Sequence, residues 1–195
     1  MNHISIEGMD GVGKTTTCQL LAQKLGYQFV EKALHFLLDD REDEITQYQK
    51  VAKRVNANEN RTFTAWFYGL NNIYLYEKFR NVNIVTDRHL VSNYCWSGTK
   101  ENTDIYHLII KKIGKPKLTV ILYAKPEVIL ARLHQRKTND ADKTKISLSD
   151  KAYEKMIYFC ETMKLPYVVI DTSDKNVEQA VEEILIKISE IEIHE

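Results

Sequence analysis

The stretch Ile4-Ser5-Ile6-Glu7-Gly8-Met9-Asp10-Gly11-Val12-Gly13-Lys14-Thr15-Thr16-Thr17 fits the pattern G-x-x-x-x-G-K-[ST] from Gly8 to Thr15 without a mismatch. In this pattern the glycines let the loop wrap closely, so that backbone N–H groups point at phosphate oxygens. Lys14 then reaches the β- and γ-phosphates, and the Thr15 hydroxyl can ligate Mg²⁺. The stretch therefore predicts a nucleotide phosphate site.

The flanking sequence has the context that this motif requires. Residues His3 to Ile6 read as a short strand, and Thr16 to Leu25 read as a helix with regularly spaced apolar residues. A strand, a glycine loop and a helix in this order bring the positive end of the helix dipole to the same anion. We therefore expect the phosphate contacts to come from one continuous segment, namely Gly8, Asp10, Gly11, Val12, Gly13, Lys14, Thr15 and Thr16.

The composition predicts an ordinary globular protein. The 195 residues include 44% apolar and 28% charged residues and have a formal net charge of zero, which gives no bulk attraction to nucleic acid or to an anionic membrane. No apolar run approaches about 20 residues, and no signal-peptide pattern precedes the first strand. The three cysteines lie far apart in no metal-like spacing, which favours reduced thiols and a cytoplasmic location. We expect one domain over residues 1–195.

Apolar strands alternate with helices along the whole chain. Strands are expected over 3–6, 27–31, 82–86, 118–123 and 167–171. Helices are expected over 16–25, 33–43, 44–58, 62–80, 107–114, from 126 onward, over 148–164, and in a last helix capped by Ser173 or Asp174. This order predicts an α/β fold in which helices cover both faces of a five-stranded parallel sheet. Ligands bind such sheets outside the carboxyl ends of the strands.

The expected helix over 62–80 is rich in aromatic residues. Its large apolar residues follow helical spacing: Phe63, Trp66, Phe67, Leu70, Ile73 and Tyr74. A stripe of this kind usually belongs to the core. Part of it can instead form the floor of a base-binding pocket, because aromatic rings stack on nucleobases, or serve an interface. The sequence leaves these three alternatives open.

Charged residues near strand ends supply the other candidates for chemistry. Asp87 follows an apolar strand, where a carboxylate can hold Mg²⁺, and Arg88 next to it offers a fork of donors for phosphate. Arg132 and Arg136 are four residues apart on one helical face, and Lys137 opens a polar loop over 137–145. Cations beside a nucleotide can neutralise a phosphoryl group in transfer.

Two absences narrow the chemistry. The Asn-Lys-x-Asp segment with which a GTPase reads guanine does not occur. Asp87 is followed by Arg88 instead of the glutamate that often activates water in hydrolytic ATPases. Both observations favour transfer to a bound acceptor over hydrolysis.

Four segments in this order resemble the thymidylate kinases of the nucleoside monophosphate kinase superfamily. They are the glycine loop from Glu7 to Thr15, Asp87-Arg88-His89-x-x-Ser92 with Trp96 and Gly98, Lys115 to Arg136 around the fourth strand, and Val169-Ile170-Asp171 before the last helix. The resemblance implies a three-layer P-loop kinase fold with a LID-like loop near 137–146. It also implies ATP- and Mg²⁺-dependent phosphorylation of a (deoxy)nucleoside monophosphate, dTMP to dTDP, in nucleotide biosynthesis, with no nucleic-acid or membrane partner. A homodimer is implied as well.

The resemblance also implies roles for individual residues. Asp10 would contact the acceptor's sugar or order the transfer site. Lys14 would hold ATP and act in transfer, and Arg88 would hold the acceptor phosphate. Thr15 and Asp87 would hold the metal, and Arg132 would contact ATP. Some members carry a catalytic arginine at the position of Gly11; in its absence the LID supplies one, which points to Arg136. The implied substrate contacts are Asp10, Phe67, Arg88, Ser92 and Trp96.

The acceptor side departs from the family pattern. The family's Arg-Glu-Pro-Gly segment is replaced by Val30-Glu31-Lys32-Ala33. The arginine that the family carries in the aromatic helix is also missing, since none lies near Phe67 to Asn72, although Arg61 precedes the helix. A nucleoside acceptor would not need these cations, and Glu31 lies where deoxynucleoside kinases carry a general base. Such a kinase is therefore one alternative, and a non-catalytic nucleotide-binding module is another.

Overall fold

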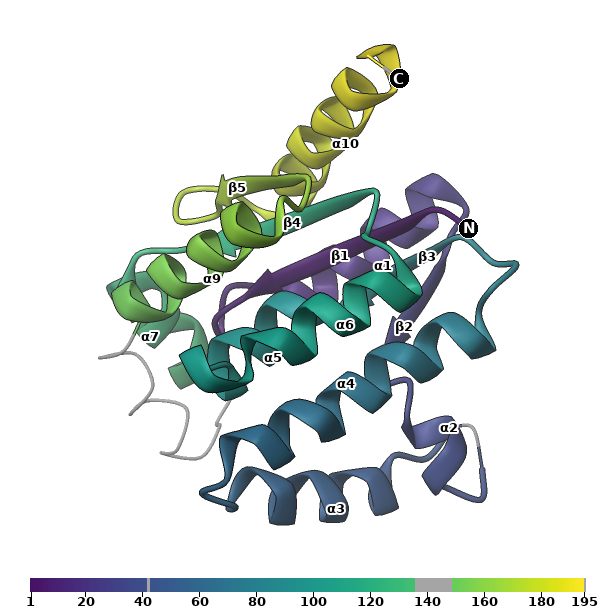
Figure 1. Ribbon diagram of the computed structural model, residues 1–195. Helices are drawn as coiled ribbons and strands as arrows, with labels where there is room; N and C mark the ends of the chain where they lie inside the picture. Colours follow the sequence, from purple (N-terminus) through teal and green to yellow (C-terminus); the bar gives the residue numbers. More distant parts are fainter. Residues whose placement is uncertain (42, 136–148, 195) are drawn as a thin grey trace.

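The computed structural model describes residues 1–41, 43–135 and 149–194 (Figure 1). Five parallel strands form one sheet in the order β2-β3-β1-β4-β5. The strands are β1 His3–Gly8, β2 Gln28–Glu31, β3 Ile84–Asp87, β4 Leu118–Tyr123 and β5 Tyr167–Asp171. The α/β fold and the five-stranded parallel sheet predicted from the sequence are confirmed.

Helices cover both faces of the sheet. They are α1 Lys14–Leu25, α2 His35–Leu38, α3 Thr46–Asn56, α4 Arg61–Lys78, α5 Leu90–Ser97, the 3₁₀-helix η1 Lys100–Asn102, α6 Thr103–Ile113, α7 Pro126–Gln135, α9 Ser149–Met163 and α10 Val177–His194. In Figure 1, α1 lies behind the sheet, where it contacts α10, and α5, α6 and α9 lie in front of it. None of the described helices is long and apolar enough to cross a membrane.

The central strands are buried on both faces. Every residue of β1 is buried, and β4 is buried apart from its last residue. The strands are rich in Ile, Val and Leu, as expected when helices cover both sides of a parallel sheet. Because all five strands run the same way, their carboxyl ends and the loops that follow them lie along one edge. That edge holds the glycine loop and Asp87.

The segment between β2 and α3 is less helical than the sequence predicts. The expected helix over 33–43 is reduced to α2, which spans His35–Leu38. Asp39 ends this turn and receives hydrogen bonds from the backbone N–H groups of Gln47 (2.6 Å) and Tyr48 (3.3 Å). The Asp39 carboxylate thereby satisfies free donors in the first turn of α3, which explains why the chain leaves the helical path there.

Two further helix predictions need correction. A helix over Leu90–Ser97 was not expected, because its residues are almost all buried and show no amphipathic period. The last helix begins after Asn176, whose side chain accepts from the Gln179 N–H (2.9 Å) while the Gln179 side chain accepts from the Asn176 N–H (3.0 Å). This reciprocal cap excludes Ser173 and Asp174 as caps.

The aromatic helix α4 does not place its stripe in the core. Its large apolar side chains are exposed, with accessible fractions of 48% for Phe63, 43% for Trp66, 49% for Leu70 and 37% for Ile73. The buried face consists mostly of small or polar residues, with one leucine: Thr64, Ala65, Gly69, Asn72 and Leu75. At Gly69 a Cβ atom would stand 2.7 Å from Ile109 Cδ1, so glycine allows α6 to approach closely. The core alternative is therefore wrong for most of the stripe.

Candidate active site

The glycine loop has the conformation that a phosphate cradle needs. Gly8, Gly11 and Gly13 all have positive φ angles, of 131°, 88° and 98°. A Cβ atom at Gly8 would lie 2.4 Å from the backbone oxygen of Leu122, so only glycine fits between the loop and β4. The loop leads directly into α1, whose N-terminal N–H groups lack intrahelical partners. The backbone therefore offers donors to an anion at this point.

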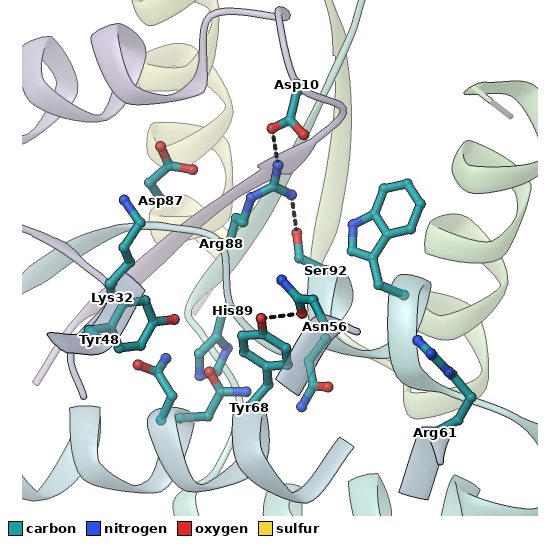
Figure 2. A pocket seen from close by; sticks show the side chains of 14 residues that line it. Asp10, Lys32, Tyr48, Asn56, Arg61, Tyr68, Asp87, Arg88, His89 and Ser92 are labelled. Atoms are coloured by element: carbon teal, nitrogen blue, oxygen red, sulfur yellow. Dashed lines mark hydrogen bonds and ion pairs between the residues drawn. The ribbon is translucent and has the colours of Figure 1, made fainter. Parts of the chain in front are cut away.

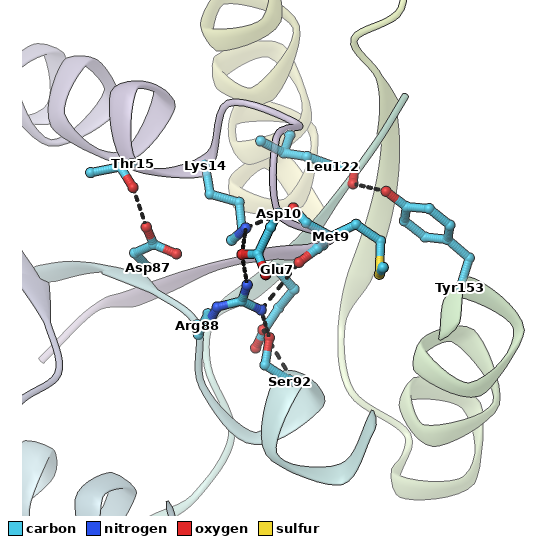
Figure 3. A network of polar contacts seen from close by, with 11 residues as sticks. Glu7, Met9, Asp10, Lys14, Thr15, Asp87, Arg88, Ser92, Leu122 and Tyr153 are labelled. Atoms are coloured by element: carbon cyan, nitrogen blue, oxygen red, sulfur yellow. Dashed lines mark hydrogen bonds and ion pairs between the residues drawn. The ribbon is translucent and has the colours of Figure 1, made fainter. Parts of the chain in front are cut away.

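Lys14 lies buried inside this loop. Its ammonium donates to the Met9 carbonyl (2.7 Å) and lies 3.7 Å from Asp10 Oδ1 (Figure 3). Burial lowers the pKa of Lys14 to about 8, and the Arg88 charge adds to this effect, while Asp10 and Asp87 oppose it. The phosphates of a nucleotide bound in the loop would further stabilise this buried cation.

Thr15 and Asp87 meet where a metal ion would bind beside the loop. The Thr15 hydroxyl donates to Asp87 Oδ2 at 2.5 Å, and Asp87 Oδ1 is buried without a hydrogen-bond partner among the described residues. One hydroxyl and one carboxylate suit Mg²⁺, which takes one or two protein carboxylates together with substrate phosphates and water. In the described part of the chain, no group of three or more His, Cys, Asp or Glu side chains is arranged so that it could hold a metal ion by itself. The donor set fits a nucleotide-bound Mg²⁺.

Arg88 joins the glycine loop to α5. Its guanidinium donates to the Gly8 carbonyl (3.2 Å) and to Ser92 Oγ (3.1 Å) and pairs with Asp10 (Figure 3). Desolvation opposes its charge, but the carboxylates of Asp10, Asp87 and Glu7 outweigh that effect and raise the pKa of Arg88. Its φ angle of 75° is unfavourable for a residue with a Cβ atom. Backbone strain of this kind is found mainly where function requires it.

Glu7 lies beneath this arginine and received no role from the sequence. Its side chain is fully buried, and its Oε2 accepts from both the backbone N–H (3.1 Å) and the hydroxyl (2.5 Å) of Ser92. Burial raises the pKa of Glu7 to about 7, although the Ser92 hydrogen bonds and the Arg88 charge act against this. The signal in the sequence was an acidic residue in the first strand, directly before the glycine loop.

A cavity of about 480 Å³ opens below Arg88 (Figure 2). We call it the acceptor cavity. Ser92 and Trp96 line it, as does Arg88. Phe67 does not line it; its ring instead stacks on Tyr48 at a centroid distance of 6.4 Å. Besides Trp96, two aromatic residues that the sequence did not single out line the cavity, Tyr48 of α3 and Tyr68 of α4.

The lining of the acceptor cavity includes polar groups without partners. Asn72 Nδ2 and both ring nitrogens of His89 are buried and make no hydrogen bond with a described residue. Burial lowers the pKa of His89, and the neighbouring His3 adds to the effect, so the ring is neutral near pH 7. Tyr68, by contrast, donates to Asn56 Oδ1 (2.6 Å). Unpaired buried polar groups are costly, and they are expected where a ligand completes them.

A second cavity, of about 280 Å³, surrounds the glycine loop and is called here the phosphate cavity. Gly11, Gly13, Lys14 and Thr15 line it. It shares four lining residues with the acceptor cavity: Asp10, Lys32, Asp87 and Arg88. The two cavities therefore meet at two acidic and two basic side chains.

A third cavity, of about 340 Å³, lies on the other side of the loop beside Val12 and Thr16. Arg132 lines it, and its guanidinium donates to the backbone oxygen (2.7 Å) and the hydroxyl (3.1 Å) of Thr172. Lys175 lies on the same wall. Gly13 lines both this cavity and the phosphate cavity, so the two adjoin across the loop.

The acceptor side is less depleted of cations than the sequence indicated. Lys32 has a left-handed backbone (φ 49°), lines both the acceptor and the phosphate cavities, and pairs with Glu31. Arg61 also lines the acceptor cavity, where its guanidinium donates to the backbone oxygens of Glu59 and Asn58. Glu31 lines the phosphate cavity. In the sequence, Lys32 could have been identified by its position directly after the second strand.

Part of the predicted site lies outside the described residues. Arg136, Lys137 and the LID-like loop near 137–146 fall within residues 136–148. The structure therefore places Asp10, Lys14, Thr15, Asp87, Arg88 and Ser92 together and says nothing of Arg136.

Comparison with known proteins agrees with this geometry. The thymidylate kinase family model matches residues 6–184. A thymidylate kinase of Nautilia profundicola is 25% identical over 188 residues, covering 91% of each chain. A "Probable thymidylate kinase" of Methanocaldococcus jannaschii is 28% identical, covering 93% of each chain. A Thermococcus kodakarensis protein named "Putative adenylate kinase" is 27% identical, covering 93% of this chain and 82% of its own.

Solved structures support the fold. A thymidylate kinase from Candida albicans superposes with a TM-score of 0.68 at 19% identity, covering all of this chain and 93% of its own. A deoxyadenosine kinase from M. mycoides superposes with a TM-score of 0.63 at 16% identity, covering 96% of this chain and 99% of its own. Because the family model spans nearly the whole chain and the phosphate loop has the geometry that its motif requires, the chain belongs to the thymidylate kinase family and is a nucleotide kinase.

Proposed function

We propose that the chain transfers the γ-phosphoryl group of ATP to a (deoxy)nucleoside monophosphate, with dTMP as acceptor and dTDP as product. The observation that carries this proposal is the junction of the phosphate and acceptor cavities at Asp10, Lys32, Asp87 and Arg88. A donor phosphate in one cavity and an acceptor phosphate in the other would meet there. Holding both in line is the larger part of phosphoryl-transfer catalysis.

On the donor side, the loop backbone and Lys14 bind the β- and γ-phosphates. The adenosine occupies the third cavity, where Arg132 supplies a flat cationic surface beside Val12. Thr15 and Asp87 would hold Mg²⁺, which neutralises charge on the phosphates when bound. These assignments rest on the lining of the two cavities.

On the acceptor side, Arg88 and Lys32 bind the acceptor phosphate. Lys32 takes over part of the role of the family's missing arginine, and Asp10 fixes the Arg88 guanidinium. An oxygen of the acceptor phosphate attacks the γ-phosphorus while the bond to the β–γ bridging oxygen breaks and ADP leaves. A phosphate is already a nucleophile, so the step needs no general base.

The base of the acceptor lies between the aromatic walls of the acceptor cavity. Tyr48 and Trp96 pack against it, and Asn72 and His89 complete their hydrogen bonds on its polar edge. Phe67 contributes by packing behind Tyr48. The choice of thymine rests on the family and on the names of most of its relatives, so adenine is the competitor to test.

Arg136 remains the proposed catalytic arginine, since Gly11 offers no side chain in the loop. We expect Arg136→Ala to lower kcat by about a hundredfold, the scale of one lost transition-state donor, while the KM for ATP changes less than about threefold. Steady-state kinetics with ATP and acceptor varied separately measure this. An unchanged kcat would contradict the assignment.

A nucleoside acceptor is the second candidate. Glu31 lies at the end of β2 opposite Asp87 and lines the phosphate cavity, where it could act as a base toward a 5′-hydroxyl. Against this, its carboxylate is paired with Lys32, a cation that a neutral nucleoside would not require.

The deciding experiment measures acceptor-dependent ADP release from Mg-ATP with dTMP, dUMP, AMP, dAMP, thymidine and deoxyadenosine. We expect turnover with dTMP and none with thymidine. Turnover with AMP in preference to dTMP would contradict the base assignment, and turnover with nucleosides alone would favour the Glu31 mechanism. ATP binding without acceptor-dependent ADP for any compound would contradict the proposed reaction.

We further propose that the chain forms a homodimer through the exposed face of α4. Phe63, Trp66, Leu70 and Ile73 form an apolar stripe there, and no charged residue occurs between Thr62 and Tyr76. A second copy of the same stripe is complementary to it, because a two-fold interface brings like surfaces together.

A further inference from the structure

Glu7 is the buried acid that the proposed reaction does not use. It lies in β1, one residue before the glycine loop, and none of its surface is accessible. Its Oε2 holds Ser92 through two hydrogen bonds, and its Oε1 is buried without a partner among the described residues. Burying a carboxylate with one oxygen unsatisfied is costly, so a purely structural role would be met better by a neutral side chain.

The direction of the hydrogen bonds links Glu7 to Arg88. A serine hydroxyl has one proton, and that of Ser92 is donated to Glu7 Oε2 at 2.5 Å. Ser92 Oγ can therefore only accept from Arg88 Nη1, which lies at 3.1 Å. The same guanidinium is held by Gly8 O and Asp10 from the loop side (Figure 3). Glu7 thus holds the Ser92 hydroxyl in the orientation in which its oxygen accepts a hydrogen bond from Arg88.

We propose that Glu7 is a positioning residue that acts through Ser92 to hold Arg88 toward the acceptor phosphate. This inference rests on the proposed function, since it takes Arg88 as the ligand of that phosphate. The strained backbone of Arg88, with φ at 75°, is a feature that persists only where the surrounding structure holds it in place. The donor-side contacts of Lys14 and Thr15 do not pass through Glu7.

The kinetic test compares Glu7→Leu, Glu7→Gln, Ser92→Ala and the double variant Glu7→Leu/Ser92→Ala. Removing the link should raise the KM for the acceptor about tenfold, the scale of one lost hydrogen bond to a charged group, and leave the KM for ATP within about twofold. Glu7→Gln retains an acceptor oxygen for Ser92 and should recover part of the loss. The double variant should be no worse than the poorer single variant, because both changes break one link.

The matched control is Ser5→Ala. Ser5 is two residues earlier on the same strand, is fully buried, and donates to Thr119 Oγ1 (3.2 Å). We expect its loss to lower stability and to leave the KM for the acceptor unchanged. The proposal would be overturned if the KM for ATP rose as much as the KM for the acceptor. It would also be overturned if the effects of the two single variants multiplied in the double variant, or if Ser5→Ala raised the KM for the acceptor equally.

A second measurement does not depend on turnover. In the wild type the Arg88 Nη groups should give resolved ¹⁵N signals, because three contacts hinder rotation of the guanidinium; Arg88→Lys assigns them. Glu7→Leu and Ser92→Ala should broaden or average these signals, Glu7→Gln should do so less, and Ser5→Ala should not. Unchanged signals would refute positioning even if the enzyme is active. If instead no monophosphate is phosphorylated, the NMR result still decides whether Glu7 holds Arg88, and the turnover result separately contradicts the proposed function.

Discussion

A single ammonium group lies at the centre of the phosphate site. Lys14 donates to Met9 O and is otherwise enclosed by the loop. We expect Lys14→Ala to lower kcat/KM by at least about a hundredfold, because a preorganised donor to the transferred phosphoryl group is lost. Lys24→Ala, at the exposed end of the same helix, is the matched control for steady-state turnover. Comparable losses in both variants would point to damage to α1 instead.

Lys32 is the residue on which the choice between acceptors depends. If it binds the acceptor phosphate, Lys32→Met should raise the KM for the monophosphate about tenfold, as expected for a lost charge-assisted hydrogen bond, with kcat less affected. The exposed Lys50 of α3, changed to Met, serves as control in the same assay. A KM for the monophosphate that does not move would remove Lys32 from the site.

At the scale of elements, His3 joins two strands and a helix. Its Nε2 bonds to Thr86 of β3 (2.8 Å) and its Nδ1 to Tyr76 of α4 (2.7 Å). Burial lowers the pKa of His3 to about 3 in the folded state, from 6.5. As the pH falls, His3 is therefore protonated in the unfolded chain before it is protonated in the folded chain. The stabilising effect of a neutral His3 is complete above pH 6.5 and is lost as the pH falls toward 3.

The protonation of His3 should therefore lower the free energy of unfolding by about 1.4 kcal/mol for each pH unit below pH 6.5. Urea unfolding between pH 6.5 and 4.5 measures this slope. His3→Gln should show a shallower slope, whatever its stability at neutral pH, and the exposed His107→Gln is the control. Equal slopes for His3→Gln and the wild type would show that another group carries the acid sensitivity.

The elements also show where sequence reasoning works and where it fails. The strands β4 and β5 were predicted to the residue, because apolar β-branched runs between turn signals have few other uses. The direction of α4 stayed open in the sequence, because periodicity shows that a helix has an apolar face and not what covers it. Here Gly69 and Ala65 give close packing on the opposite face, so the bulky side chains point outward.

The site was predictable to the extent that it lies in contiguous motifs. Lys14, Thr15, Asp87 and Arg88 come from two short segments with recognisable spacing. Tyr48, Asn72 and Glu7 could not be assigned, because their positions depend on the packing of α3, α4 and α5 around the sheet edge. Such neighbours become visible only when the segments are assembled.

At the scale of the whole molecule, the α4 stripe determines the expected assembly. Leu70→Asp should convert a dimer into a monomer, because a buried charge without a partner opposes association. Ile186→Asp on α10 is a matched control, since both side chains are exposed aliphatic residues on helices. Sedimentation velocity distinguishes the two states. A wild type that is monomeric at micromolar concentration would contradict the proposed interface.

The left-handed backbone at Lys32 leads to a prediction about selection. Asparagine tolerates this conformation better than lysine does, so Lys32→Asn should relieve strain and raise thermal stability. It would also remove the cation shared by the acceptor and phosphate cavities. A library screened only for heat resistance should therefore enrich asparagine at position 32, and the same library screened for growth dependent on turnover should return lysine. The two screens would diverge at this codon, which marks it as a position where activity is kept at the expense of stability.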